Sequence, residues 1–89
     1  MKAIVTVVGK DRVGIIAAVC NQLAAFQVNV LDISQTVMQG YFTMMMAVEV
    51  SECTVPVAEL GKHLDALGKD MGLSIRVQRE DIFNAMHRI

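Results

Sequence analysis

The chain has 89 residues, of which 54% are hydrophobic and 19% are charged, and its formal net charge is -1. This length predicts one domain, which buries only about 60 to 65% of its unfolded surface and is therefore a candidate for oligomerisation. The composition excludes a disordered chain, and the charge provides no basic surface for nucleic acid. No apolar run approaches the roughly 20 residues of a membrane span, and the first residues do not resemble a signal peptide, so we expect a cytoplasmic protein without a membrane partner.

Residues 3–8, AIVTVV, predict a strand whose two faces are both apolar, which is typical of a central position in a sheet. Residues 14–26 then carry apolar side chains at helical spacing, and polar Asn21 and Gln22 fall outside that stripe. The sequence therefore predicts a strand followed by a helix that packs on the sheet through one face.

The turn between them, residues 9–14 (GKDRVG), is the candidate ligand site. Gly9 and Gly14 allow backbone angles that other residues avoid, and they let another molecule approach the main chain. Asp11 is placed to cap the helix or to receive a cation. The N–H groups at the start of the helix favour a small anion such as a carboxylate. The alternative is a tight turn without a ligand, which is the interpretation that glycine spacing alone favours.

Residues 29–38 alternate between apolar and polar side chains and predict a half-buried strand. Its apolar face is expected to hold Leu31, Ile33 and Val37, and its polar face Asp32, Ser34 and Thr36. A short turn at Gln39 and Gly40 leads into residues 41–50, whose two faces are both apolar, so this hairpin ends in a second central strand.

The second half of the chain repeats the pattern of strand and helix. After Pro56, apolar residues recur at spacings of three and four and predict a helix that ends in a left-handed cap at Gly72. Residues 73–78 predict a fourth strand with one polar face. With right-handed crossovers, this order gives an α+β fold with a four-stranded antiparallel sheet, order 4-1-3-2, and two helices on one face.

The domain is expected to span residues 1–80, followed by a short helical tail at residues 81–89 that Asp81 caps. A helix of this length needs a docking surface. The tail is therefore expected to pack on its own uncovered sheet face, on a second subunit or on a partner protein.

The sequence contains no catalytic constellation, so we expect a protein that is not an enzyme and holds no cofactor or metal. His63 lies among charged residues and His87 in the tail, where neither has the cleft and partner that a catalytic base needs. Cys20 and Cys53 are too far apart for a metal or redox motif and are expected to be free thiols. Residues 44–46, three methionines, point to alternate faces and favour core packing over a soft-metal site.

Two stretches carry a resemblance to a known family. Residues 7–15 (VVGKDRVGI), followed by residues 26–35 (FQVNVLDISQ), resemble the ACT domain, a small regulatory module of amino-acid metabolism. With its tail, the chain is similar to stand-alone ACT-domain proteins of bacteria and archaea. The resemblance implies a ferredoxin-like βαββαβ sandwich that forms a homodimer and often binds an amino acid where the subunits meet.

By position, the resemblance gives ligand-binding roles to Gly9, Asp11, Val13 and Gly14 of one chain and to Asn29 of the other. The chain departs from the family at Gly9, where some ligand-binding members carry a histidine. We therefore expect a non-catalytic regulatory homodimer that binds a small amino acid and transmits this to a partner. The alternatives are a protein-interaction module without a ligand and an accessory to folate-linked one-carbon metabolism.

Overall fold

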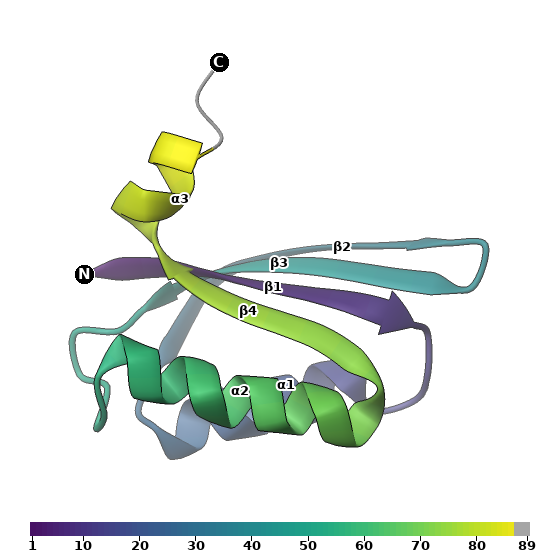
Figure 1. Ribbon diagram of the computed structural model, residues 1–89, viewed down its shortest axis with the longest axis horizontal. Helices are drawn as coiled ribbons and strands as arrows, with labels where there is room; N and C mark the ends of the chain where they lie inside the picture. The colour runs from purple at the N-terminus through teal and green to yellow at the C-terminus, as the bar shows by residue number, and fades with distance from the viewer. Residues whose placement is uncertain (87–89) are drawn as a thin grey trace.

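The computed structural model describes residues 1–86, and residues 87–89 lie outside the described part. The elements are β1 (Lys2–Lys10), α1 (Ile15–Ala25), β2 (Asn29–Met38), β3 (Tyr41–Glu49), α2 (Val57–Met71), β4 (Leu73–Arg79) and α3 (Glu80–Met86). The strands form one antiparallel sheet in the order β2-β3-β1-β4, with α1 and α2 on the same face (Figure 1). The predicted fold and strand order are confirmed.

The core lies between the sheet and the two helices. The central strands β1 and β3 each turn one set of alternate side chains toward the helices, and these are fully buried. Apolar residues at helical spacing in α1 and α2 pack against these side chains from the helix side of the core, as the periodicity predicts. The largest fully buried side chains are Val5, Val7, Val19, Leu23, Met44, Met46, Val48, Leu60 and Leu64. Met44 and Met46 are thus packing residues.

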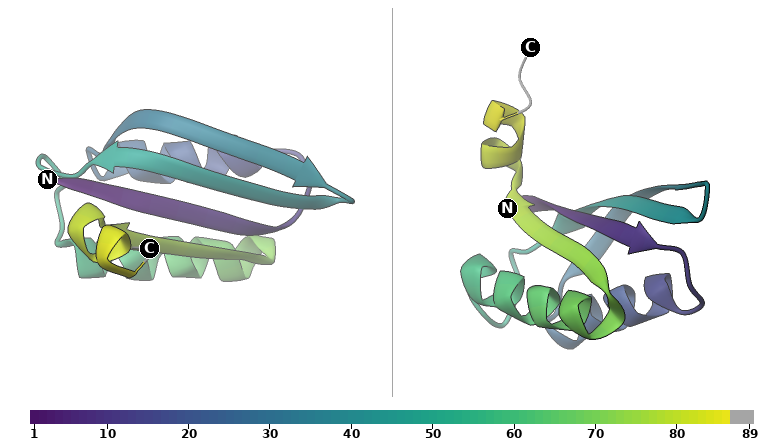
Figure 2. Two further views of the ribbon diagram at one scale, coloured as in Figure 1. Left: turned by 90° about the horizontal axis from the view of Figure 1, so that it is seen from above. Right: turned by 45° about the vertical axis from the view of Figure 1, so that its right-hand side comes forward.

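The other face of the sheet is not covered by α1 or α2. Val8 on β1 and Met45 on β3 point to this side, and the side chain of Val8 is 42% exposed. The described part of the tail, α3, rises from the same side at the end of the sheet where β1 begins (Figures 1 and 2). His87 and Ile89, which complete the predicted tail, lie outside the described residues.

Helix α3 begins at Glu80, one residue before the predicted cap, and its first turn is held to β4 by a charged pair. Arg79 Nη2 and Nε donate to the two carboxylate oxygens of Asp81 at 2.7 and 3.2 Å. The guanidinium lowers the pKa of Asp81, and Asp81 also accepts the N–H of Ile82 at 3.0 Å. This two-point contact joins the first turn of α3 to the end of β4.

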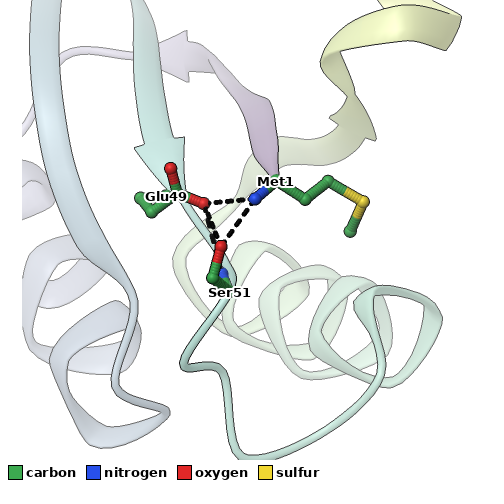
Figure 3. A network of polar contacts seen from close by, with 3 residues as sticks. All are labelled: Met1, Glu49 and Ser51. Carbon is green, nitrogen blue, oxygen red and sulfur yellow. Dashed lines mark hydrogen bonds and ion pairs between the residues drawn. The ribbon is translucent and has the colours of Figure 1, made fainter.

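A second polar network joins the start of β1 to the end of β3 (Figure 3). The terminal ammonium of Met1 donates to Glu49 Oε2 at 2.5 Å and to Ser51 Oγ at 2.6 Å, and the Ser51 hydroxyl also donates to Glu49 Oε2. Bonds from the ammonium and the hydroxyl lower the pKa of Glu49 to about 2. Glu49 is therefore an ionised anchor for this end of the sheet.

The prediction that β2 is half-buried is wrong. Every residue from 31 to 40 is exposed, on the helix-facing side of the strand as well as on the other. A bulge at Leu31 shifts the register between Val30 and Asp32, so alternation does not run through the strand unbroken. Toward its tip, the β2–β3 hairpin also stands clear of the helices (Figure 1). Strand β2 is consequently an exposed edge of the sheet.

Candidate functional site

The loop after β1 is shorter than predicted, because β1 continues through Lys10. Gly9 lies inside the strand and pairs with Phe42 of β3 and Leu73 of β4. A Cβ at Gly9 would stand 2.5 Å from Leu73 Cδ2 and 3.2 Å from the carbonyl oxygen of Gly72, so the start of β4 leaves little room for a side chain here. Gly9 is therefore explained by packing within the sheet, and the loop proper begins at Asp11.

The loop is tied down at two points. The backbone N–H of Asp11 donates to the carbonyl oxygen of Gly40 at 2.8 Å, which joins the loop to the tip of the β2–β3 hairpin. Arg12 Nη1 donates to the carbonyl oxygen of Met71 at 3.2 Å, at the end of α2. A carbonyl at a helix C-terminus lacks an intrahelical partner and carries part of the negative end of the dipole, so a guanidinium is suited to it.

The start of α1 lies open to a ligand. The cap residue is Gly14, whose φ of 91° places it in the left-handed region, and a Cβ there would meet nothing within 4 Å. Among the described residues no side chain caps the helix, so the prediction that Asp11 caps it is wrong. The first intrahelical hydrogen bond runs from the Ala18 N–H to the carbonyl oxygen of Gly14. The backbone N–H groups before Ala18 belong to the first turn, where they have no intrahelical partner.

A hollow of about 400 Å³ lies between this loop, the first turn of α1 and the inner side of β2. It is lined by Asp11, Arg12, Gly14, Ile15, Ile16, Ala17, Gln35, Val37 and Phe42. Two charged side chains, Asp11 and Arg12, and the N-terminus of α1 form one wall of the hollow. The remaining wall and the floor are apolar apart from Gln35, so the hollow suits a small molecule that is charged at one end.

The structure brings together only part of the predicted site. Asp11 and Gly14 line the hollow, whereas Val13 is 98% exposed at the tip of the loop and does not line it. Asn29 opens β2 and pairs with Glu49, at the end of the hairpin far from its tip, whereas Asp11 is bonded to that tip. Ten residues of strand, about 30 Å in extended geometry, separate these ends, so Asn29 and Asp11 of one chain do not meet.

Gln35 is a lining residue that the sequence analysis missed. It pairs with buried Met44 and shares the helix-facing side of β2 with Ile33 and Val37. The detectable signal is a polar residue at a position where alternation requires an apolar one. That break in the pattern marks the floor of the hollow.

The remaining chemistry is sparse. Within residues 1–86, no group of three His, Cys, Asp or Glu side chains could hold a metal ion. Cys20 and Cys53 are free thiols, as predicted. His63 packs its ring against Phe26, with 4.7 Å between the ring centroids. In this part of the chain no helix has the length and apolar character needed to cross a membrane.

Comparisons with known proteins agree with the fold. The family model described as ACT domain matches residues 2–78. Relatives in bacteria and archaea are UPF0237 proteins; one from Listeria monocytogenes is 49% identical over 89 residues, which is 100% of both chains. Among solved structures, an ACT domain protein from Streptococcus pneumoniae superposes with a TM-score of 0.83 at 44% identity and covers 98% of each chain.

The fold also recurs inside larger proteins. A formyltetrahydrofolate deformylase from Pseudomonas syringae matches with a TM-score of 0.80 and 20% identity, over 88% of this chain and 27% of that one. At this identity the match shows the fold alone. Together, the family model and the full-length relatives identify the chain as a member of the ACT domain family.

Proposed function

We propose that the chain is a non-catalytic regulatory ACT domain that pairs with a second copy along β2 and binds a small amino acid between the two chains. The observation that carries the proposal is the position of the hollow, which opens beside an exposed sheet edge and holds only half of the residues that the family resemblance implies. The second half, Asn29, would come from the partner.

The exposed edge of β2 supports the pairing. The strand carries large exposed apolar side chains, among them Val37 at 55% and Met38 at 67%, and Asp32 is its one charged residue. The opposite edge, β4, carries Arg76 and Arg79. Proteins protect free edges with charge, so β4 resembles a protected edge and β2 an edge that pairs with another strand.

Antiparallel pairing of two β2 strands would also complete the site. A two-fold axis near the middle of β2 reverses the direction of the second strand. Asn29 of the second chain would then lie beside Met38 of the first, next to the hairpin tip that holds Asp11. Two identical composite sites would form, one at each end of the shared strand pair.

The chemistry of this composite site fits the main-chain groups of an amino acid. The unpaired N–H groups at the start of α1 can donate to a carboxylate, and the dipole of the helix favours a negative charge there. The Asp11 carboxylate and the side-chain oxygen of Asn29 can accept from an ammonium. A zwitterion satisfies both requirements, and no nucleophile or base is needed.

The test combines sedimentation with a thermal-shift screen of the common amino acids. We expect a dimer, and an amino acid at one hundred times its dissociation constant adds about 2.7 kcal/mol of stability. Asp11→Ala and Asn29→Ala should each abolish the shift. Met38→Lys on β2, which does not line the hollow, should give a monomer that binds nothing, whereas Val8→Lys on the open sheet face serves as the matched control and should remain dimeric.

The second candidate function is a protein-interaction module without a ligand. It is supported by the open sheet face, where Ile4, Met45 and Ala47 border a hollow of about 210 Å³, and by Ile82 of α3, which is 46% exposed. Absence of any thermal shift at millimolar amino acid would replace the sensing proposal with this one. A third role, accessory to folate-linked one-carbon metabolism, is supported only by the shared fold.

A further inference from the structure

The floor of the hollow carries a polar side chain, Gln35, in an otherwise apolar row of β2. On β2, Ile33, Gln35 and Val37 face the helices, because their partners on β3 are the buried residues Met46, Met44 and Phe42. Gln35 thus interrupts an apolar row without packing into the core, since its own side chain remains exposed. Neither the core nor the strand pairing requires an amide at this position.

The charged residues of the hollow lie at its other wall. Asp11 and Arg12 belong to the loop after β1, beside the free end of α1. If the carboxylate and ammonium of a ligand are held at this wall, its side chain extends across the hollow toward β2. There it meets Gln35, which lines the hollow together with Val37 and Phe42 and with Ile16 and Ala17 of α1.

We infer that Gln35 determines the specificity of the site and selects amino acids with a short, uncharged side chain that carries a hydroxyl or carboxamide group. The carboxamide of Gln35 offers two donors and an acceptor, so it can bond to either group. An aliphatic side chain of the same size would cover the amide without a partner, and an unpaired polar group costs more than a lost bond. The inference rests on the proposed function, because it concerns the same site.

The test uses pairs of probes that match in size. Threonine and valine differ by a hydroxyl in place of a methyl group, and asparagine and leucine by a carboxamide in place of a branched alkyl group. For the full-length chain we expect threonine to bind about tenfold or more tightly than valine, as measured by calorimetry and thermal shift. Gln35→Leu should reverse this order by removing the amide at nearly constant volume.

Ser34→Ala provides the matched control. It alters the neighbouring residue of β2, whose partner Met45 lies on the opposite face of the sheet, and it should leave the ligand order unchanged. Because Gln35 and Ser34 are both exposed, both variants should fold, which their melting curves verify. Valine binding as tightly as threonine, or an unchanged order in Gln35→Leu, would overturn the inference while the proposed function stands. If no amino acid binds the wild-type chain, the proposed function itself fails.

Discussion

The backbone N–H of Asp11 donates a hydrogen bond of 2.8 Å to the carbonyl oxygen of Gly40, and this bond joins the loop after β1 to the tip of the β2–β3 hairpin. The loop and strand β2 of this hairpin line opposite sides of the hollow. The shape of the site therefore depends on a turn that contributes none of its lining side chains.

The hairpin turn should respond in opposite directions to two neighbouring substitutions. Gln39 and Gly40 have φ of 52° and 82°, both in the left-handed region that a two-residue hairpin requires. Gly40→Val should lower the free energy of unfolding by about 1–2 kcal/mol, because a β-branched residue is strained there. Gln39→Asn should raise it, since Asn is favoured in this turn. Denaturant unfolding at a fixed protein concentration measures both, and equal effects of the same sign would contradict this account of the turn.

The end of α1 offers a stabilising substitution. The Val28 N–H donates to the carbonyl oxygen of Leu23, and the Gln27 N–H donates to that of Ala24. This is a Schellman motif, in which Gln27 takes the left-handed position with a φ of 62°. Gln27→Gly should relieve the strain of a side chain at this φ and raise stability by roughly 0.5 kcal/mol. That gain corresponds to about 2–4 °C in Tm for a domain of this size. Gln22→Gly, inside the helix, is the control and should lower Tm.

Two glycines of α2 should differ in their tolerance of alanine. A Cβ at Gly68 would stand 2.6 Å from the carbonyl oxygen of Leu73, which is backbone and cannot move freely, whereas a Cβ at Gly61 would stand 3.3 Å from Val77 Cγ1. Alanine gains about 1 kcal/mol over glycine in a helix. Gly68→Ala should nevertheless lower Tm, because α2 must shift away from β4. Gly61→Ala should lower Tm less than Gly68→Ala does. Equal Tm values for the two variants would be inconsistent with this close contact.

Stability should depend on pH through Glu49. Its pKa is about 2 in the folded chain, against an ordinary value of 4.5, because the Met1 ammonium and Ser51 bond to its carboxylate. Because the pKa is lowered, ionised Glu49 stabilises the folded chain fully above pH 4.5, and this stabilisation is lost as the pH falls toward 2. Glu49→Gln should therefore reduce the fall in Tm between neutral and acidic pH. Glu52→Gln, in the adjacent loop, is the control, and an identical pH profile for wild type and Glu49→Gln would contradict the assignment.

Much of the fold follows from short-range pattern. The central strands, the apolar faces of the two helices and the cap at Gly72, φ 72°, could be predicted because each depends on alternation, helical spacing or a local backbone requirement. The exposure of β2 could not, because alternation shows which residues share a face and not whether a helix covers that face. The bulge at Leu31 and the close approach of Leu73 to Gly9 likewise depend on neighbours distant in sequence.

The site was predictable only in part for the same reason. Asp11 and Gly14 lie close together in the sequence, so their pattern was detectable. Gln35 enters the hollow only because β2 folds back beside the loop. Asn29 lies at the other end of β2, and no property of a single chain brings it to Asp11. The proposed site therefore requires the proposed dimer.

A complementation experiment tests this central claim most directly. Asp11→Ala and Asn29→Ala chains are mixed, unfolded, refolded together and titrated with the amino acid that the wild-type chain binds. If each site takes Asp11 from one chain and Asn29 from the other, a mixed dimer holds one intact site, and random mixing restores binding to about a quarter of the sites. Binding that does not rise above that of either variant alone would contradict a site shared between two chains.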